Sequence, residues 1–276
     1  MYQEYYQGKT ALITGGSSGI GFALADALSD IGAELVLLAR DYENLEIAKT
    51  ALQKKHPQAK VNIVSADVTD GDSLSKFYEK FLGNHEAPDF LFNCAGVSRP
   101  GYVEELPLSV FTWTMDIDYH GTVNIVKLLL PGMLERGSGH IVNVSSIAGV
   151  VGLFGYTAYC GAKFAVKGFS DALRSELKPK GIKVSVLYPP DTDTPQLAWE
   201  NQYKPAETSA ITGASKPISP EFVAHCTLKE AARGKYAIVP GFDAKLMYFA
   251  STRLGDWIYP IMDLMVRSAS KKKSTT

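Results

Sequence analysis

Residues 10–31 read TALITGGSSGIGFALADALSDI, and this stretch decides the predicted fold. A short aliphatic run, TALIT, is followed by a glycine-rich turn and then by apolar residues at helical spacing. Gly15, Gly19 and Gly21 let the backbone turn sharply and approach a ligand closely. The amides at the start of the following helix point to the same place, so the stretch predicts a cradle for a pyrophosphate.

The glycines follow the spacing G-x-x-x-G-x-G, which departs from the G-x-G-x-x-G dinucleotide fingerprint. A tight turn without a ligand is therefore the alternative interpretation. If the cradle is real, Ser17, Ser18 and Ile20 lie within it and are predicted to contact the cofactor together with the three glycines.

Strand-like and helix-like patterns alternate outward from this stretch. The strand-like runs are residues 10–14, 34–38, 61–65, 89–93, 140–146, 183–188 and 236–240. The helix-like runs are residues 19–31, 43–55, 71–83, 107–134, 157–178 and 219–233. Several strands are continuously aliphatic, which suits a parallel sheet covered on both faces. We therefore predict an α/β fold with a Rossmann-type, doubly wound parallel sheet.

No linker or internal repeat divides the chain. We expect one domain over residues 1–240, with the proline-containing connection 190–218 as a substrate lid. Residues 241–276 are predicted to form a C-terminal helical extension.

Composition excludes several classes of function. A net charge of −1 in 276 residues gives no general attraction to nucleic acid. Three scattered cysteines suggest neither a disulfide framework nor a metal site, so a reducing cytoplasm is the expected setting. The histidines also lack metal-ligand spacing and are expected to be structural or surface residues: His56, His85, His120, His140 and His225. The start of the chain is polar and aromatic, unlike a signal peptide, and no window is apolar enough to span a membrane.

The end of the second strand bears on the choice of cofactor. A dinucleotide without a 2′-phosphate is usually held there by an acidic residue that accepts from the ribose hydroxyls. This chain has Ala39 and Arg40 instead. The Arg40 guanidinium can meet a 2′-phosphate through charge-assisted hydrogen bonds, which favours NADPH over NADH. A solvated surface arginine is the alternative.

A serine, a tyrosine and a lysine indicate the chemistry. Ser146 ends a predicted strand, and Tyr159 and Lys163 are four residues apart, on one face of a predicted helix. Because an ammonium stabilises a nearby phenolate, we expect the pKa of Tyr159 to be lowered toward neutrality. Tyr159 can then donate a proton to a ketone oxygen that Ser146 polarises. A core tyrosine beside a surface lysine is the alternative.

With TGGSSGIG (14–21), NCAG (93–96), Ser146 and YCGAK (159–163), the chain resembles the short-chain dehydrogenase/reductase family over roughly residues 8–240. The resemblance implies a nicotinamide cofactor and Ser146, Tyr159 and Lys163 as the catalytic group, with Tyr159 and Lys163 also at the cofactor. It further implies cofactor contacts from Asp67, Val68, Asn93, Ala95 and Gly96.

One position departs from the family pattern. Members usually carry asparagine three residues before a glycine in the long central helix, where it supports a water-linked proton relay to the lysine. This chain has Asp118 before Gly121. Aspartate has the same shape and accepts hydrogen bonds, although it cannot donate when ionised. We expect Asp118 to support the same relay and count it with the catalytic residues.

The sixth strand runs into a stiff, acidic turn, YPPDTDTP (188–195). The second proline fixes φ where the family usually has glycine, and Pro189, Thr192 and Thr194 are predicted to contact the nicotinamide end of the cofactor. Residues 188–208 and LFGYTAY (153–159) resemble one branch of the family, the 3-ketodihydrosphingosine reductases. The implied reaction is NADPH-dependent reduction of a long-chain amino ketone to sphinganine. Alternatives are another lipophilic ketone, steroid or fatty-acyl derived, or an NADPH-binding scaffold without turnover.

Four acidic residues of the lid can attract the ammonium of such a substrate: Asp191, Asp193, Glu200 and Glu207. Solvated loop carboxylates are the alternative interpretation.

The C-terminal segment has an amphipathic pattern. Apolar residues recur at helical spacing, Pro260 is expected to kink or break the helix, and three lysines follow at 271–273. An interfacial helix on anionic lipid is one prediction, with contact at the cytoplasmic face of a membrane. Packing on the domain or on a second subunit is the other, and we expect a homodimer or homotetramer.

Overall fold

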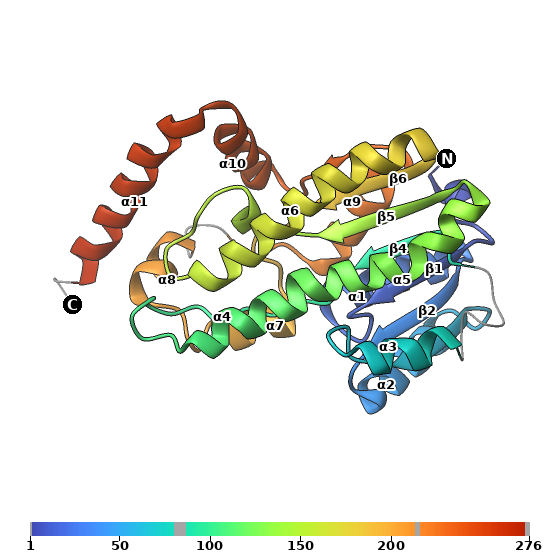
Figure 1. Cartoon of the computed structure of the whole chain (residues 1–276). Coiled ribbons are helices and arrows are strands. Elements are labelled where there is room, and N and C mark those ends of the chain that lie inside the picture. The colour runs from blue at the N-terminus through green and yellow to red at the C-terminus, as the bar shows by residue number, and fades with distance from the viewer. Residues whose placement is uncertain (1, 80–86, 213–215, 274–276) are drawn as a thin grey trace.

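The computed structural model describes residues 2–79, 87–212 and 216–273 and shows one sheet between two layers of helices (Figure 1). Within these residues, seven parallel strands lie in the order β3-β2-β1-β4-β5-β6-β7. Their bounds are β1 (Thr10–Thr14), β2 (Glu34–Ala39), β3 (Lys60–Ser65), β4 (Phe90–Asn93), β5 (Gly139–Val144), β6 (Ile182–Leu187) and β7 (Ala237–Ile238). The order reverses between β1 and β4, where doubly wound sheets bind their ligands.

Alternate side chains of each strand enter two separate cores, which explains the continuously aliphatic strands. On β1, Ala11 and Ile13 pack in one core and Leu12 packs in the other. The first core is covered by α1 (Gly19–Ile31), α2 (Tyr42–Lys55) and α9 (Pro220–Ala232). The second is covered by α3 (Gly71–Phe77), α5 (Gly121–Arg136) and α6 (Thr157–Leu177). The predicted α/β doubly wound fold is confirmed, although residues 80–83 of the helix predicted at 71–83 lie outside the described residues.

The single helix predicted over 107–134 contains an irregularity. The structure has α4 (Leu108–Met115), a π-helical turn (Asp116–His120) and then α5. Such turns insert a residue into a helix and often occur at functional sites. Asp118 lies in this turn and is fully buried.

The 190–218 connection contains two short helices, α7 (Pro195–Glu200) and α8 (Ala206–Thr212). Thr194 starts α7 by accepting a hydrogen bond from the Leu197 amide at 3.3 Å, and proline follows at the first helical position. The base of the connection is closed by the Asp193 amide, which donates to the Ile218 carbonyl at 2.9 Å. Residues 213–215 of the predicted lid lie outside the described residues.

The C-terminal segment forms α10 (Phe242–Arg253) and α11 (Ile258–Lys273). The chain bends between them at Gly255, which has φ of +54°. Pro260 lies in the first turn of α11, where its missing N–H has no helical partner to lose. The prediction that Pro260 breaks the helix is therefore wrong, because the glycine before it ends the preceding helix.

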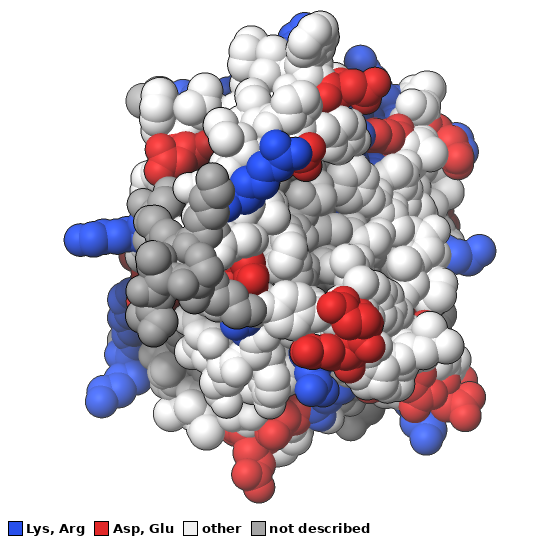
Figure 2. Space-filling view, turned by 90° about the vertical axis from the view of Figure 1, so that its left-hand side faces the viewer, with Lys and Arg blue, Asp and Glu red and all other residues white. Residues whose placement is uncertain are grey.

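The predicted apolar stripe of this segment has two environments. Ile258 is buried beside Ala244 in a cluster on the domain, whereas Leu246 and Ile261 are 60% and 49% exposed. Figure 2 faces the side on which α11 lies and shows a wide uncharged area with charged side chains mainly around it. Among the described residues, the helices are all too short or too polar to cross a bilayer. Packing on the domain is thus found for one face, and lipid binding by the other stays a prediction.

Candidate active site

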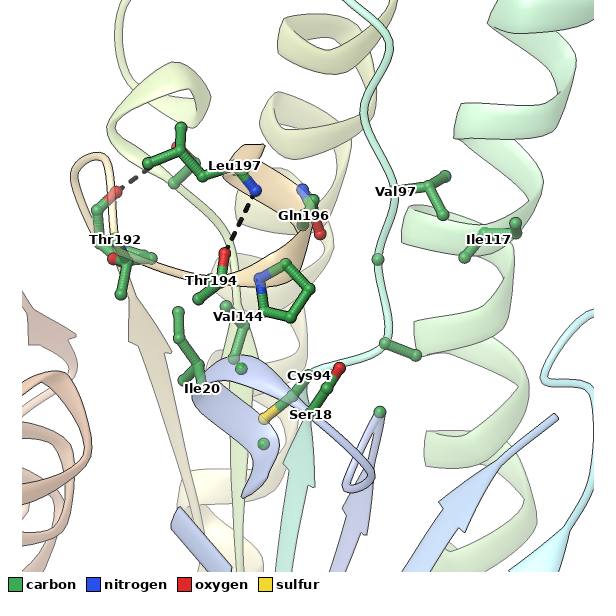
Figure 3. Close-up of a pocket in the computed structure, with 18 of the residues that line it drawn as sticks. Ser18, Ile20, Cys94, Val97, Ile117, Val144, Thr192, Thr194, Gln196 and Leu197 are labelled. Carbon is green, nitrogen blue, oxygen red and sulfur yellow. Dashed lines mark hydrogen bonds between the residues drawn. The ribbon is translucent and has the colours of Figure 1, made fainter. Parts of the chain in front are cut away.

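Loops that follow six different strands line one cavity of about 380 Å³. Figure 3 shows Ser18 of the glycine loop, Cys94 after β4 and Thr194 after β6 around the same space. Because the strands are parallel, their carboxyl ends share one edge of the sheet, and loops distant in sequence meet there.

Backbone forms the wall of the cavity at the glycine loop. A Cβ on Gly21 would lie 2.3 Å from the Gly15 carbonyl oxygen, and a Cβ on Gly15 would lie 3.0 Å from the Ala95 nitrogen. Gly15 also has φ of +63°, so glycine is required at both positions. Ser17, Ser18, Gly19 and Ile20 complete this wall at the start of α1. A backbone wall at a helix N-terminus suits an anionic group such as a pyrophosphate.

Arg40 and Asp41 line the cavity after β2. Arg40 is exposed, as a residue that meets a charged ligand from solvent would be. Asp41 was missed by the sequence reasoning. Its Oδ1 accepts from the Asn44 amide at 2.9 Å and caps α2. An aspartate directly before a helical run is the signal that identifies such a cap.

Asp67 and Val68 line the cavity after β3, as the resemblance implies. Asp67 Oδ1 accepts from the amide and hydroxyl of Thr69 at 2.9 and 2.8 Å. The Val68 carbonyl accepts from the Asn124 side chain at 2.9 Å. A Cβ on Gly121 would lie 2.5 Å from Val68 Cγ2, so this glycine lets the long helix approach the site.

Asn93 does not reach the cavity, in contrast to the implied cofactor contact. Its amide nitrogen donates to Asn143 Oδ1 at 2.9 Å, and Asn143 donates in turn to Ser170 Oγ at 2.8 Å. Asn93 thus belongs to a buried network beneath the site. The predicted residues Ala95 and Gly96 do line the cavity.

Ser146 and Tyr159 meet at the cavity. Ser146 follows β5, and Tyr159 lies in the first turn of α6; both side chains line the cavity, and the Ser146 hydroxyl lies close enough to the Tyr159 phenol to lower its pKa. Ser146 Oγ also accepts from the Ala148 amide at 3.1 Å, which fixes its position. The two hydroxyls are therefore placed to share one ligand oxygen.

Lys163 and Asp118 form a buried ion pair beside this tyrosine. Lys163 Nζ lies 3.2 Å from Asp118 Oδ2 and 5.4 Å from the centre of the Tyr159 ring. Lys163 Nζ also donates to the Val144 carbonyl at 3.1 Å, and Asp118 Oδ1 accepts from the Val97 amide at 2.7 Å. All four predicted catalytic residues are thus brought together.

The pKa of Tyr159 differs from the expectation. Burial raises the pKa of this phenol well above 10, and the charges of Asp118 and Glu200 raise it further. The prediction of a lowered pKa is wrong for this arrangement, because it counted the Lys163 cation without the burial of the phenol and without the Asp118 carboxylate paired with Lys163. The phenol consequently stays protonated across the neutral pH range.

Pro189, Thr192 and Thr194 line the cavity in the segment that follows β6. The Thr192 hydroxyl donates to the Pro190 carbonyl at 2.9 Å, which leaves its lone pairs as acceptors. The Thr194 hydroxyl accepts a hydrogen bond from the Leu197 amide at the start of α7, so its own proton is still available for donation to a ligand.

The four acidic residues of the 190–218 connection lie in different places. Asp191 and Glu200 line the cavity, and Asp191 lies 3.5 Å from Lys204 Nζ. Asp193 is exposed and is not among the lining residues. Glu207 is buried and accepts from the Tyr102 hydroxyl at 2.6 Å.

The described parts of the chain contain no cluster of His, Cys, Asp and Glu that could hold a metal ion. His140 is buried, contacts Ser185 Oγ at 2.8 Å and has its pKa lowered to about 3 by burial. This histidine is structural, whereas the prediction for His85 lies outside the described residues.

A family model and two curated relatives match most of the chain. The family model described as short chain dehydrogenase matches residues 9–204. The 3-ketodihydrosphingosine reductase of Dictyostelium discoideum is 36% identical, with 94% of this chain and 83% of the relative aligned. The Bos taurus protein of the same name is 40% identical, with 87% of this chain and 73% of the relative aligned.

Solved structures have the same fold. Levodione reductase is 27% identical with a TM-score of 0.77, covering 90% of this chain and 99% of that one. L-Sorbose reductase from Gluconobacter frateurii, complexed with NADPH and L-sorbose, is 26% identical with a TM-score of 0.72. The alignment covers 84% of this chain and 94% of that one.

Proposed function

The chain belongs to the short-chain dehydrogenase family and is an oxidoreductase, and we propose that it reduces 3-ketodihydrosphingosine to sphinganine with NADPH. The observation that carries the proposal is that Ser146, Tyr159 and Lys163 line one cavity with the glycine loop. The relatives named for this reaction support the choice of substrate.

The cavity residues fit a nicotinamide dinucleotide, which supplies the hydride when bound. The glycine loop and the start of α1, which line the cavity, would hold the pyrophosphate, and Asp67 and Val68 would contact the adenine ring. Lys163 would contact the nicotinamide ribose. Pro189, Thr192 and Thr194 would contact the carboxamide, for which Thr192 offers an acceptor and Thr194 a donor.

The side chains of the site orient the ketone and donate a proton to it. Ser146 Oγ orients the ketone oxygen against the Tyr159 hydroxyl. Tyr159 gives its proton to that oxygen as the carbonyl carbon is reduced. Its raised pKa keeps the Tyr159 hydroxyl protonated at neutral pH. Lys163 positions the phenol and the ribose, and Asp118 holds Lys163 in place.

The substrate is tested by following NADPH oxidation with purified protein. We expect rapid turnover with 3-ketodihydrosphingosine and a kcat/KM at least about tenfold lower with 1-hydroxyoctadecan-3-one, which has the same chain without the amine. Equal rates would indicate a reductase of general lipophilic ketones. Reduction of the neutral ketone alone would show that the proposed substrate is wrong.

Arg40 is the residue proposed to determine the preference for NADPH over NADH. Arg40→Ala is expected to raise KM for NADPH about ten- to a hundredfold, because a charge-assisted contact to the 2′-phosphate is lost. KM for NADH should change little. Lys49→Ala on α2, outside the lining residues, is the control and should leave both constants unchanged. Equal losses for the two cofactors after Arg40→Ala would refute the assignment.

A further inference from the structure

Glu200 stands out among the acidic groups of the lid. It ends α7, lines the cavity and is only 7% exposed. Its Oε2 accepts from the Tyr156 hydroxyl at 2.9 Å, and its Oε1 accepts from Gln196 Nε2 at 2.8 Å. Both carboxylate oxygens are thus fixed by neutral donors, with no cation in hydrogen bond to either of them among the described side chains.

At the end of the cavity near Glu200, the described residues carry more negative than positive charge. Asp191 and Glu200 bring two carboxylates, whereas Lys204 is the cation beside them and lies 3.5 Å from Asp191. Burial raises the pKa of Glu200, against the effect of its two hydrogen bonds and of Lys204. A buried carboxylate held by neutral donors gains stability when a cation approaches it.

Glu200 is close to the chemical centre. It is hydrogen-bonded to Tyr156, whose ring centre lies 5.9 Å from that of Tyr159. The charge of Glu200 also contributes to the raised pKa of Tyr159. The carboxylate and the proton donor therefore face one part of the same cavity.

We propose that Glu200 binds the ammonium group of the substrate and selects amino ketones over neutral ketones of the same length. The inference rests on the proposed function, because it requires a substrate with an amine next to the ketone. In such a molecule the nitrogen and the carbonyl oxygen belong to one N–C–C=O unit, the unit found in a peptide backbone. A carboxylate that binds the amine must then lie near the group that protonates the ketone, and Glu200 is hydrogen-bonded to Tyr156, whose ring neighbours that of Tyr159.

The other three acids fit this role less well. Asp191 already has Lys204 as its partner, and Asp193 is exposed outside the cavity. Glu207 accepts from Tyr102 and is not among the lining residues. The sequence pattern suggested all four, and the packing of α7 against Tyr156 distinguishes one of them.

The test is Glu200→Gln, which keeps the size of the side chain and an acceptor for Tyr156 but removes the charge. We expect KM for 3-ketodihydrosphingosine to rise about ten- to a hundredfold, the range for a lost charge-assisted hydrogen bond. KM for 1-hydroxyoctadecan-3-one should change by less than about threefold. Glu207→Gln is the matched control and should leave the ratio of the two KM values unchanged.

The outcomes separate the inference from the proposed function. If the parent reduces the amino ketone and Glu200→Gln raises KM equally for both substrates, the inference is wrong and the proposed function stands. If the parent reduces only the neutral ketone, the function itself is wrong. Should Glu200→Gln fail to fold, competition in the parent decides the question: sphinganine must inhibit at least about tenfold more strongly than N-acetylsphinganine. Equal inhibition by the two would also overturn the inference.

Discussion

Tyr159→Phe is expected to lower kcat for ketone reduction about 10²–10⁴-fold, the usual contribution of a positioned proton donor. The substitution removes the hydroxyl proposed to give its proton to the ketone oxygen and keeps the ring, whose centre lies 5.4 Å from Lys163 Nζ. The fold and the cofactor cradle should be unaffected. Stopped-flow or steady-state oxidation of NADPH measures the loss.

Two controls accompany this measurement. Binding of NADPH, followed by its fluorescence, should change by less than about fivefold in Tyr159→Phe, because the glycine loop and Arg40 are untouched. Tyr156→Phe removes a hydroxyl from a ring whose centre lies 5.9 Å from that of Tyr159. With the neutral ketone, this variant should keep a kcat near that of the parent. A Tyr159→Phe enzyme as fast as the parent would refute the proposed chemistry.

The strands and the cradle could be predicted because their signals are local. The run TALIT (10–14) matches β1, and the other predicted strands overlap the observed ones with shifts at their ends. The glycine positions were informative because each depends on a close backbone approach, such as that of Gly21 to Gly15. Burial of both faces of a parallel sheet leaves little ambiguity in such a pattern.

The errors concern features that depend on distant partners. The π turn at Asp116–His120 was missed, because one inserted residue hardly changes the apolar period of a long helix. Asn93 was placed at the cofactor, but its amide bonds to Asn143 on the neighbouring strand. The pKa of Tyr159 was predicted from its spacing to Lys163. Its direction is set by burial and by Asp118, which lies on another helix.

Asp118 was expected to support a relay in place of asparagine, and the structure gives it a direct ion pair with Lys163. Asp118→Ala should lower the free energy of unfolding by about 3–5 kcal/mol, because it leaves a buried ammonium without its counter-charge. It should also lower kcat about 10–100-fold, since Lys163 loses the contact that orients it. Thermal or urea unfolding and NADPH oxidation measure the two effects.

Asp118→Asn separates positioning from charge. The amide oxygen can still accept from the Val97 amide, although the counter-charge of Lys163 is lost, so we expect a smaller stability loss than in Asp118→Ala. The charge of Asp118 raises the pKa of Tyr159, and removing it must lower that pKa. Ketone reduction needs the protonated phenol, so the alkaline limb of kcat/KM should move to lower pH in Asp118→Asn. A purely structural role would leave the limb in place, and a limb that did not move would show that Asp118 holds the helix without tuning the proton donor.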